Sequence, residues 1–214
     1  MRRAIFILAS VCLTSGIACG QWVPISGRIV TTTETISSDG TVSMKWKTVS
    51  QYSRSSSGSV LIQRLGRSGK PATGTLIDYG KSKRVYSLTY NDGKVNDTHH
   101  ALDRGYAAAP PTGPTVTHQK SSLGTEKVNG IDCFIVPVYD ISPTRERSLI
   151  GKAWLAPGFN NLVVKEDVMR PKLGGSKRHI VREFTVTSQN EPDPSLFSTD
   201  RAAVTKQWKV PAVK

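Results

Sequence analysis

Two carboxylates near the end of the chain have a spacing at which paired acids can act in catalysis. Glu191 and Asp193 flank Pro192 in the stretch EPDPSLF, and carboxyl groups held this close carry out glycoside hydrolysis. A structural role accounts for more of the stretch, because Asp193 followed by Pro194 is the pattern of a helix N-cap and a first helical residue. The Leu-Phe pair that follows would then pack as an apolar plug. We therefore predict a strand end and one helical turn here, and no catalytic residue.

The histidines and serines also lack the arrangement that metal or covalent chemistry requires. His99 and His100 are adjacent, so their side chains point apart, and His118 and His179 add no helical ligand spacing. No serine has the G-x-S-x-G context of a hydrolase nucleophile, and LGGSK lacks the first glycine of a phosphate-binding loop. We expect no metal, no cofactor and no enzymatic activity.

The first 20 residues have the organisation of a secretory signal peptide. Arg2 and Arg3 precede an apolar run that is too short for a lasting membrane anchor, and no later stretch predicts a transmembrane span. Two outcomes remain open: ordinary cleavage near Ala18, or lipid attachment at Cys19, whose context GIAC resembles a bacterial lipobox except at Gly16. We expect an exported protein of the periplasm or outer envelope of a Gram-negative bacterium, anchored through Cys19 if the lipid is attached.

The composition predicts a folded, basic protein. Apolar residues make up 37% of the 214 residues and charged residues 21%, which suits one domain with a core. Removing Arg2 and Arg3 with the signal peptide lowers the formal charge from +13 to +11. Such a charge favours anionic partners, and export argues against nucleic acid. Envelope lipids, acidic glycans or a merely solvated basic surface remain as explanations.

The region after the signal peptide alternates between apolar and polar residues as strands do. In TVSMKWKTVSQY, Met44 and Trp46 share one face while Lys45 and Lys47 share the other, which is typical of an antiparallel sheet with one wet face. We predict an all-β, mainly antiparallel fold with little helix: a strongly curved sheet, a half-barrel or open barrel, of about nine strands. These span residues 27–36, 41–52, 59–65, 74–80, 83–90, 131–140, 148–157, 161–171 and 177–188.

The same patterns divide the chain that remains after cleavage into two parts. Residues 21–198 form a single predicted β domain, interrupted at 97–122 by a stretch rich in Ala, Pro, Gly and Thr that suits a long crossing loop or flap. Residues 199–214 carry little pattern and are expected to form a loose basic tail. Cys133 lies in the apolar run IDCFIVPV, where a lone thiol behaves as a small buried hydrophobe.

The second half of the chain resembles an uncharacterised family of exported bacterial β-proteins that ends in an EPDPxLF motif. More distantly, the order of strands resembles the periplasmic lipoprotein carriers of LolA/LolB-like architecture, in which a curved antiparallel sheet surrounds an apolar hollow. The resemblance implies a fold and an envelope location and brings no catalytic residues with it. The matching positions are Gly124, Val128, Gly130, Trp154, Ala156, Pro157 and Glu191 to Phe197.

Aromatic side chains on the predicted strands are the candidate ligand-binding residues. On the concave face of a curved sheet they would line an apolar pocket; otherwise they fill the core. The first function that we consider is therefore non-enzymatic binding of an apolar or amphipathic ligand, such as a lipid or a lipidated protein. The alternatives are a structural or interaction protein with a filled core and, with least support, an envelope hydrolase. The candidate pocket residues are Trp46, Tyr52, Tyr86, Tyr90, Phe134, Trp154 and Phe184.

Overall fold

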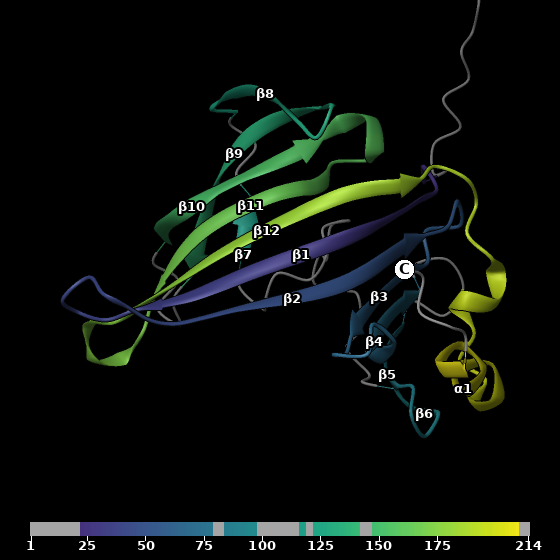
Figure 1. Cartoon of the computed structure of the whole chain (residues 1–214). Helices are drawn as coiled ribbons and strands as arrows, with labels where there is room; N and C mark the ends of the chain where they lie inside the picture. The colour runs from purple at the N-terminus through teal and green to yellow at the C-terminus, as the bar shows by residue number, and fades with distance from the viewer. Residues whose placement is uncertain (1–21, 79–83, 98–115, 119–121, 142–146, 210–214) are drawn as a thin grey trace, which may run out of the picture.

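The computed structural model describes residues 22–78, 84–97, 116–118, 122–141 and 147–209. Twelve strands form one antiparallel sheet in the order β6-β5-β4-β3-β2-β1-β12-β11-β10-β9-β7, and β8 pairs with the edge of β9 beside β7 (Figure 1). The strands are β1 (Ile25–Ile36), β2 (Val42–Arg54), β3 (Val60–Leu65), β4 (Pro71–Asp78), β5 (Arg84–Thr89), β6 (Lys94–Asp97), β7 (Val116–His118), β8 (Gly124–Val128), β9 (Ile131–Ile141), β10 (Arg147–Ala156), β11 (Leu162–Pro171) and β12 (Lys177–Ser188).

The predicted fold class is confirmed, with more strands than expected. Each of the nine predicted strands corresponds to an observed one, and the three additional strands are β6, β7 and β8, of four, three and five residues. Strands this short show too few alternations to be recognised in a sequence. Strand β7 lies inside the predicted crossing loop at 97–122, and most of that loop lies outside the described residues.

The sheet is curved and open. Strand β7 is at one end of the strand order, yet it is seen behind the central strands β12 and β1 in Figure 1, so this end of the sheet bends back. Among the described strands, β6 and β7 are not paired with each other. We call the face enclosed by the bend the inner face, and the opposite face the outer face. Cross-strand pairs put Ile29 with Phe184, and Thr33 with Ile180, on the inner face.

Apolar clusters lie on both faces of the sheet. On the inner face, Ile29, Tyr52 and Phe184 belong to one cluster at the β1–β2–β12 centre, and Val136 and Val168 to another on β9–β11. A third cluster lies on the outer face of β3–β5, where Leu61, Leu76, Leu88, Tyr90 and Val204 are at most 1% exposed. A fourth cluster lies near β8, β9 and β10, with Val128, Cys133, Trp154, Ala156 and Val164, so the core is distributed along the sheet.

The stretch EPDPSLF forms the predicted cap and helical turn. The short helix η4 (Pro194–Phe197) begins with Pro194, and the Asp193 side chain accepts a hydrogen bond of 2.9 Å from the Ser195 amide. Leu196 and Phe197 pack against the outer-face cluster. Glu191 is exposed, and its two carboxylate oxygens accept from one backbone amide at 3.2 and 3.1 Å. Asp193 and Glu191 therefore stabilise loops by accepting hydrogen bonds from backbone amides.

The predicted loose tail is wrong for its first part, because residues Arg201–Lys209 form the helix α1. Val204 of α1 is completely buried against the outer-face cluster. Gln63 of β3 donates to Gln207 at 2.9 Å and to the Tyr90 hydroxyl at 3.0 Å, which joins α1 to the sheet. The sequence of α1 shows little apolar periodicity, because one buried valine is enough to dock so short a helix. Within the described residues no helix is long and apolar enough to cross a membrane.

Candidate functional site

The register of β11 against β12 gathers charged side chains on the inner face. Arg170 lies opposite Arg178, and Glu166 lies opposite Arg182. The same register puts Asp167, the neighbour of Glu166, on the outer face, which confirms that these adjacent acids face opposite sides. The inner face therefore carries three guanidinium groups and one carboxylate within two neighbouring strands.

The carboxylate of this cluster is deeply buried and only partly neutralised. Glu166 is 2% exposed, and Nη1 of Arg182 lies 3.2 Å from its Oε2, an ion-pair distance without the orientation of a hydrogen bond. Burial raises the pKa of Glu166, although Arg182 and then Arg170 oppose this shift. Burial likewise lowers the pKa of Arg182, which Glu166 counteracts. Each charge is therefore held in an environment that favours an additional counter-charge.

Several donors of the arginine cluster lack a partner. Nε of Arg170, Nε of Arg178 and Nη1 of Arg182 are buried and donate to no acceptor within the described residues. The guanidinium group of Arg178 lies 5.8 Å from the ring centre of Trp46, which covers one of its sides. Buried donors are almost always satisfied in folded proteins, so unpaired ones in a half-buried, cationic cluster indicate a place for an acceptor.

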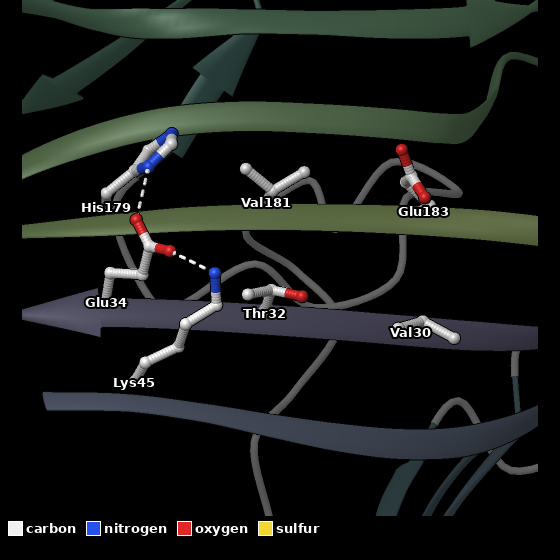
Figure 2. A pocket seen from close by; sticks show the side chains of 7 residues that line it. All are labelled: Val30, Thr32, Glu34, Lys45, His179, Val181 and Glu183. Atoms are coloured by element: carbon white, nitrogen blue, oxygen red, sulfur yellow. Dashed lines mark hydrogen bonds and ion pairs between the residues drawn. The ribbon is translucent and has the colours of Figure 1, made fainter.

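The outer face of the same strands holds a different polar arrangement (Figure 2). His179 lies between two carboxylates: its Nε2 is 2.8 Å from Asp167 and its Nδ1 is 3.5 Å from Glu34. Lys45 on β2 forms an ion pair of 2.7 Å with Glu34. A pocket of about 280 Å³ lies here, lined by Val30, Thr32, Glu34, Lys45, His179, Val181 and Glu183.

This outer cluster fits a structural ladder better than a catalytic centre. Burial acts to lower the pKa of His179, but the hydrogen bonds and charges of Asp167 and Glu34 outweigh it and raise that pKa. The hydrogen bonds of Lys45 and then His179 lower the pKa of Glu34. Alternating charges of this kind, on four adjacent strands, hold the strands in register. Thr32 carries the hydroxyl in the pocket lining, but within the described residues the imidazole is hydrogen-bonded to the two carboxylates and not to this hydroxyl, so no nucleophile is activated.

The aromatic residues predicted to line a pocket are spread over separate parts of the sheet. Tyr52 and Phe184 meet edge to face, with ring centres 5.4 Å apart, in the inner-face cluster. Tyr90 and the half-buried Tyr86 belong to the outer-face cluster beneath α1. Trp46 stands apart beside the arginines. The structure therefore brings Tyr52 and Phe184 into contact and places Tyr86 and Tyr90 in a separate cluster.

The remaining two aromatic candidates lie near the β8–β9 edge. Trp154 is 8% exposed, donates from Nε1 to Glu126 at 2.8 Å, and has Lys165 Nζ 4.7 Å from its ring centre. Phe134 is 44% exposed and lines a small polar pocket with Cys133. Cys133 itself is a free, buried thiol, as predicted, and burial raises its pKa. Cys19, the candidate lipidation residue, lies outside the described residues.

The arginine cluster was not predicted, although one signal for it is visible in the sequence. Arg178 and Arg182 are separated from Ile180 and Phe184 by even intervals in the strand KRHIVREF, so they share the face that points to the core. Arginine on an inward face is unusual and indicates either a buried ion pair or a ligand. Whether Arg170 joins these two arginines depends on the register of β11 against β12, which the length of the turn between them fixes.

Comparison with known proteins gives no family and only distant structural likenesses. No family model and no curated protein matches the chain. A DUF1329 family protein from Desulfovibrio piger shares 11% identity over 83% of this chain and 90% of its own, with a TM-score of 0.34. A LolA-superfamily protein from Nitrosomonas europaea shares 9% over 84% and 92%, with a TM-score of 0.33. PNGF-II shares 12% over 81% of this chain and only 30% of its own, with a TM-score of 0.41.

These structural likenesses are all distant. Identities of 9–12% and TM-scores of 0.33–0.41 are too low to transfer a ligand or an activity. The comparisons leave the ending motif EPDPxLF untested as a family marker, so that part of the resemblance stays a prediction. What the chain binds must be argued from its own residues.

Proposed function

We propose that this protein is an exported, non-enzymatic cell-envelope protein that binds an amphipathic ligand, a lipid or a lipidated protein, against the inner face of its curved sheet. The observation that carries the proposal is the arginine cluster of Arg170, Arg178 and Arg182. Its partly buried guanidinium donors lack acceptors, and one carboxylate faces three cations. An anionic head group would supply both the acceptors and the charge.

The apolar half of such a ligand would follow the same face away from the cluster. Val168 and Ile180 pair with each other between the Arg170–Arg178 pair and the Glu166–Arg182 pair, and both belong to or pack against the apolar cluster on β9–β11. Charged and apolar side chains therefore lie next to one another on the inner face of these strands. This arrangement suits an amphipathic molecule better than a purely apolar or a purely ionic one.

Burial of the aromatic residues favours the alternative of a structural or interaction protein with a filled sheet. Tyr52, Tyr90 and Phe184 are at most 2% exposed, which supports the core role that the sequence suggested for them beside a pocket-lining role. A structural or interaction protein with a filled sheet would show this burial as well. The arginine donors that lack a partner, however, favour a bound ligand over a filled sheet.

The location in the envelope is part of the proposal. It rests on the signal-peptide pattern of residues 1–20 and on the basic composition. We propose the periplasm or outer envelope of a Gram-negative bacterium, with Cys19 as an anchor if it carries lipid. Substitution Cys19→Ala tests the anchor: a lipid-anchored protein leaves the membrane fraction, whereas ordinary secretion leaves the fractionation unchanged.

The decisive experiment compares two amphiphiles that differ in charge. Calorimetric titration of the processed protein with dodecyl phosphate, below the concentration at which it forms micelles, should give saturable binding, and dodecyl maltoside should bind much more weakly. Replacing Arg170 and Arg178 by Gln should weaken dodecyl phosphate binding roughly ten-fold or more, since each charged hydrogen bond contributes about 1.5 kcal/mol or more.

Two controls separate the proposal from general charge effects. The pair Arg64→Gln and Lys206→Gln removes the same charge from exposed positions elsewhere and should leave binding unchanged. Equal binding of both amphiphiles, or equal loss in both double variants, contradicts the proposal. Native mass spectrometry of protein purified from its own envelope provides a second readout, and a chain that carries no co-purified lipid supports the filled-sheet alternative.

A further inference from the structure

Two hairpin ends project together from one side of the sheet. The turn after β1 and the turn after β11 lie side by side in Figure 1, and Ile36 at the end of β1 pairs with Lys177 at the start of β12. The turns themselves are close, since a Cβ atom placed on Gly175 would lie 3.6 Å from the Cβ of Ser38. We call residues 36–47 and 170–178 together the paired hairpin tip.

The paired hairpin tip exposes large apolar side chains. Val42 is 55% exposed and Met44 61% exposed, both at the start of β2. Strand β3 pairs only with Ser50–Arg54 of β2, so among the described strands the edge of β2 next to these residues is uncovered. Such side chains at a projecting end contribute nothing to the core, and exposed apolar groups of this kind mark surfaces that contact something else.

The same tip is strongly basic. Its two segments contain six basic residues and one acid, Asp39. Lys47, Lys172 and Lys177 are exposed, and within the part of the chain that the structure describes they form no ion pair. Asp39 is engaged locally, accepting hydrogen bonds from the Thr41 amide and hydroxyl at 2.9 and 2.8 Å. Apolar side chains are therefore surrounded by cations that are free to contact anionic groups.

We propose that the paired hairpin tip docks the protein on an anionic lipid surface. Val42 and Met44 would enter the head-group region while the lysines contact lipid phosphates, and the charge of the tip is complementary to such a surface. A weak apolar signal and a basic patch bind membranes reversibly only when they act together. Arg170 and Arg178 of the tip also belong to the ligand site proposed for the inner face, but this inference rests on other side chains, the exposed Val42 and Met44 and the lysines.

Co-sedimentation with lipid vesicles tests the proposal. The processed protein should sediment with vesicles of phosphatidylcholine containing about 30 mol% phosphatidylglycerol, and not with phosphatidylcholine alone. The pair Lys172→Gln and Lys177→Gln should weaken the partition roughly ten- to thirty-fold, and added salt should do the same to the wild type. The pair Val42→Ser and Met44→Ser should weaken it with the charge unchanged. Circular dichroism confirms that each variant is folded.

Matched controls distinguish binding through the paired hairpin tip from non-specific adsorption through other parts of the surface. Leu123→Ser with Phe134→Ser removes apolar side chains that are 56% and 44% exposed away from the tip, and Arg64→Gln with Lys206→Gln removes two distant charges. Both control pairs should bind as the wild type does. Equal loss in tip and control variants, equal binding to neutral vesicles, or no sedimentation at all would overturn the proposal. Because dodecyl phosphate binding depends on Arg170 and Arg178, a failure of either proposal leaves the other standing.

Discussion

Arg182 on β12 reaches across to Glu166 on β11, with 3.2 Å between Nη1 and Oε2, on a face where the carboxylate is 2% exposed. This ion pair is the only neutralisation that the described residues provide for the arginines around it. Its loss would leave those cations facing one another.

Replacing Glu166 by Gln should therefore destabilise the protein by about 3 kcal/mol, since breaking a buried pair leaves an uncompensated charge. Inorganic phosphate should restore more stability to this variant than to the wild type, because an anion can replace the lost carboxylate. Denaturant unfolding measures both effects. Glu183→Gln is the control: Glu183 is exposed on the outer face, so its loss should change stability by about 0.5 kcal/mol or less.

Stability should also depend on pH through His179. Its pKa in the folded protein is raised above 6.5, so protonated His179 stabilises the fold, and this contribution is complete below pH 6.5. It is lost as the pH rises through the folded-state pKa. The effect should be about 1 kcal/mol or less, since the ladder is partly exposed.

Unfolding curves recorded across neutral pH measure this contribution. His179→Gln should remove that part of the pH dependence, and Asp167→Asn should reduce it because the 2.8 Å contact is lost. A wild-type curve that is flat through this range would contradict the assigned role.

Arg54 connects the segment just before β1 to the β10–β11 turn. It is completely buried, donates from Nε to the Val23 carbonyl at 3.0 Å and from Nη2 to the Phe159 carbonyl at 2.9 Å. Arg54→Met keeps the bulk of the side chain and leaves these carbonyls unpaired, which should cost about 3 kcal/mol. Thermal or denaturant unfolding measures the loss, and Arg64→Met, at an exposed position, should be nearly neutral.

Helix α1 should be necessary for stability although it lies at the end of the described chain. Val204→Asp places a charge at a fully buried position and should cost about 3 kcal/mol or more. Ala202→Asp, two residues earlier on the exposed side, should be neutral or slightly stabilising near a helix N-terminus. If both variants unfold at the same denaturant concentration, α1 does not belong to the folded unit.

What could be predicted from the sequence was local in character. Alternation within the strands gave the all-β class, and Asp193–Pro194 indicated the cap and turn, because both signals lie within a few adjacent residues. The opposite facing of Glu166 and Asp167 follows from the pleat in the same way. Short strands such as β8 and a helix with one buried residue, Val204, leave too weak a local pattern.

The arginine cluster needed information that lies between strands. That Arg170 faces Arg178 depends on the register of β11 and β12, which the intervening turn sets. Likewise, Trp46 approaches Arg178 only because β1 separates their strands at the right offset. The strands that carry the aromatic residues were predicted correctly. The distribution of these residues over two faces was not, because it depends on where the sheet bends.

The open order of strands from β6 to β7 has a mechanical consequence. A closed barrel has a radius that is set by its strand number and stagger, so its interior has one size. This sheet has two edges that, among the described strands, are not hydrogen-bonded to each other. Bending between strands can therefore change the width of the space beside the inner face while every ladder hydrogen bond is kept.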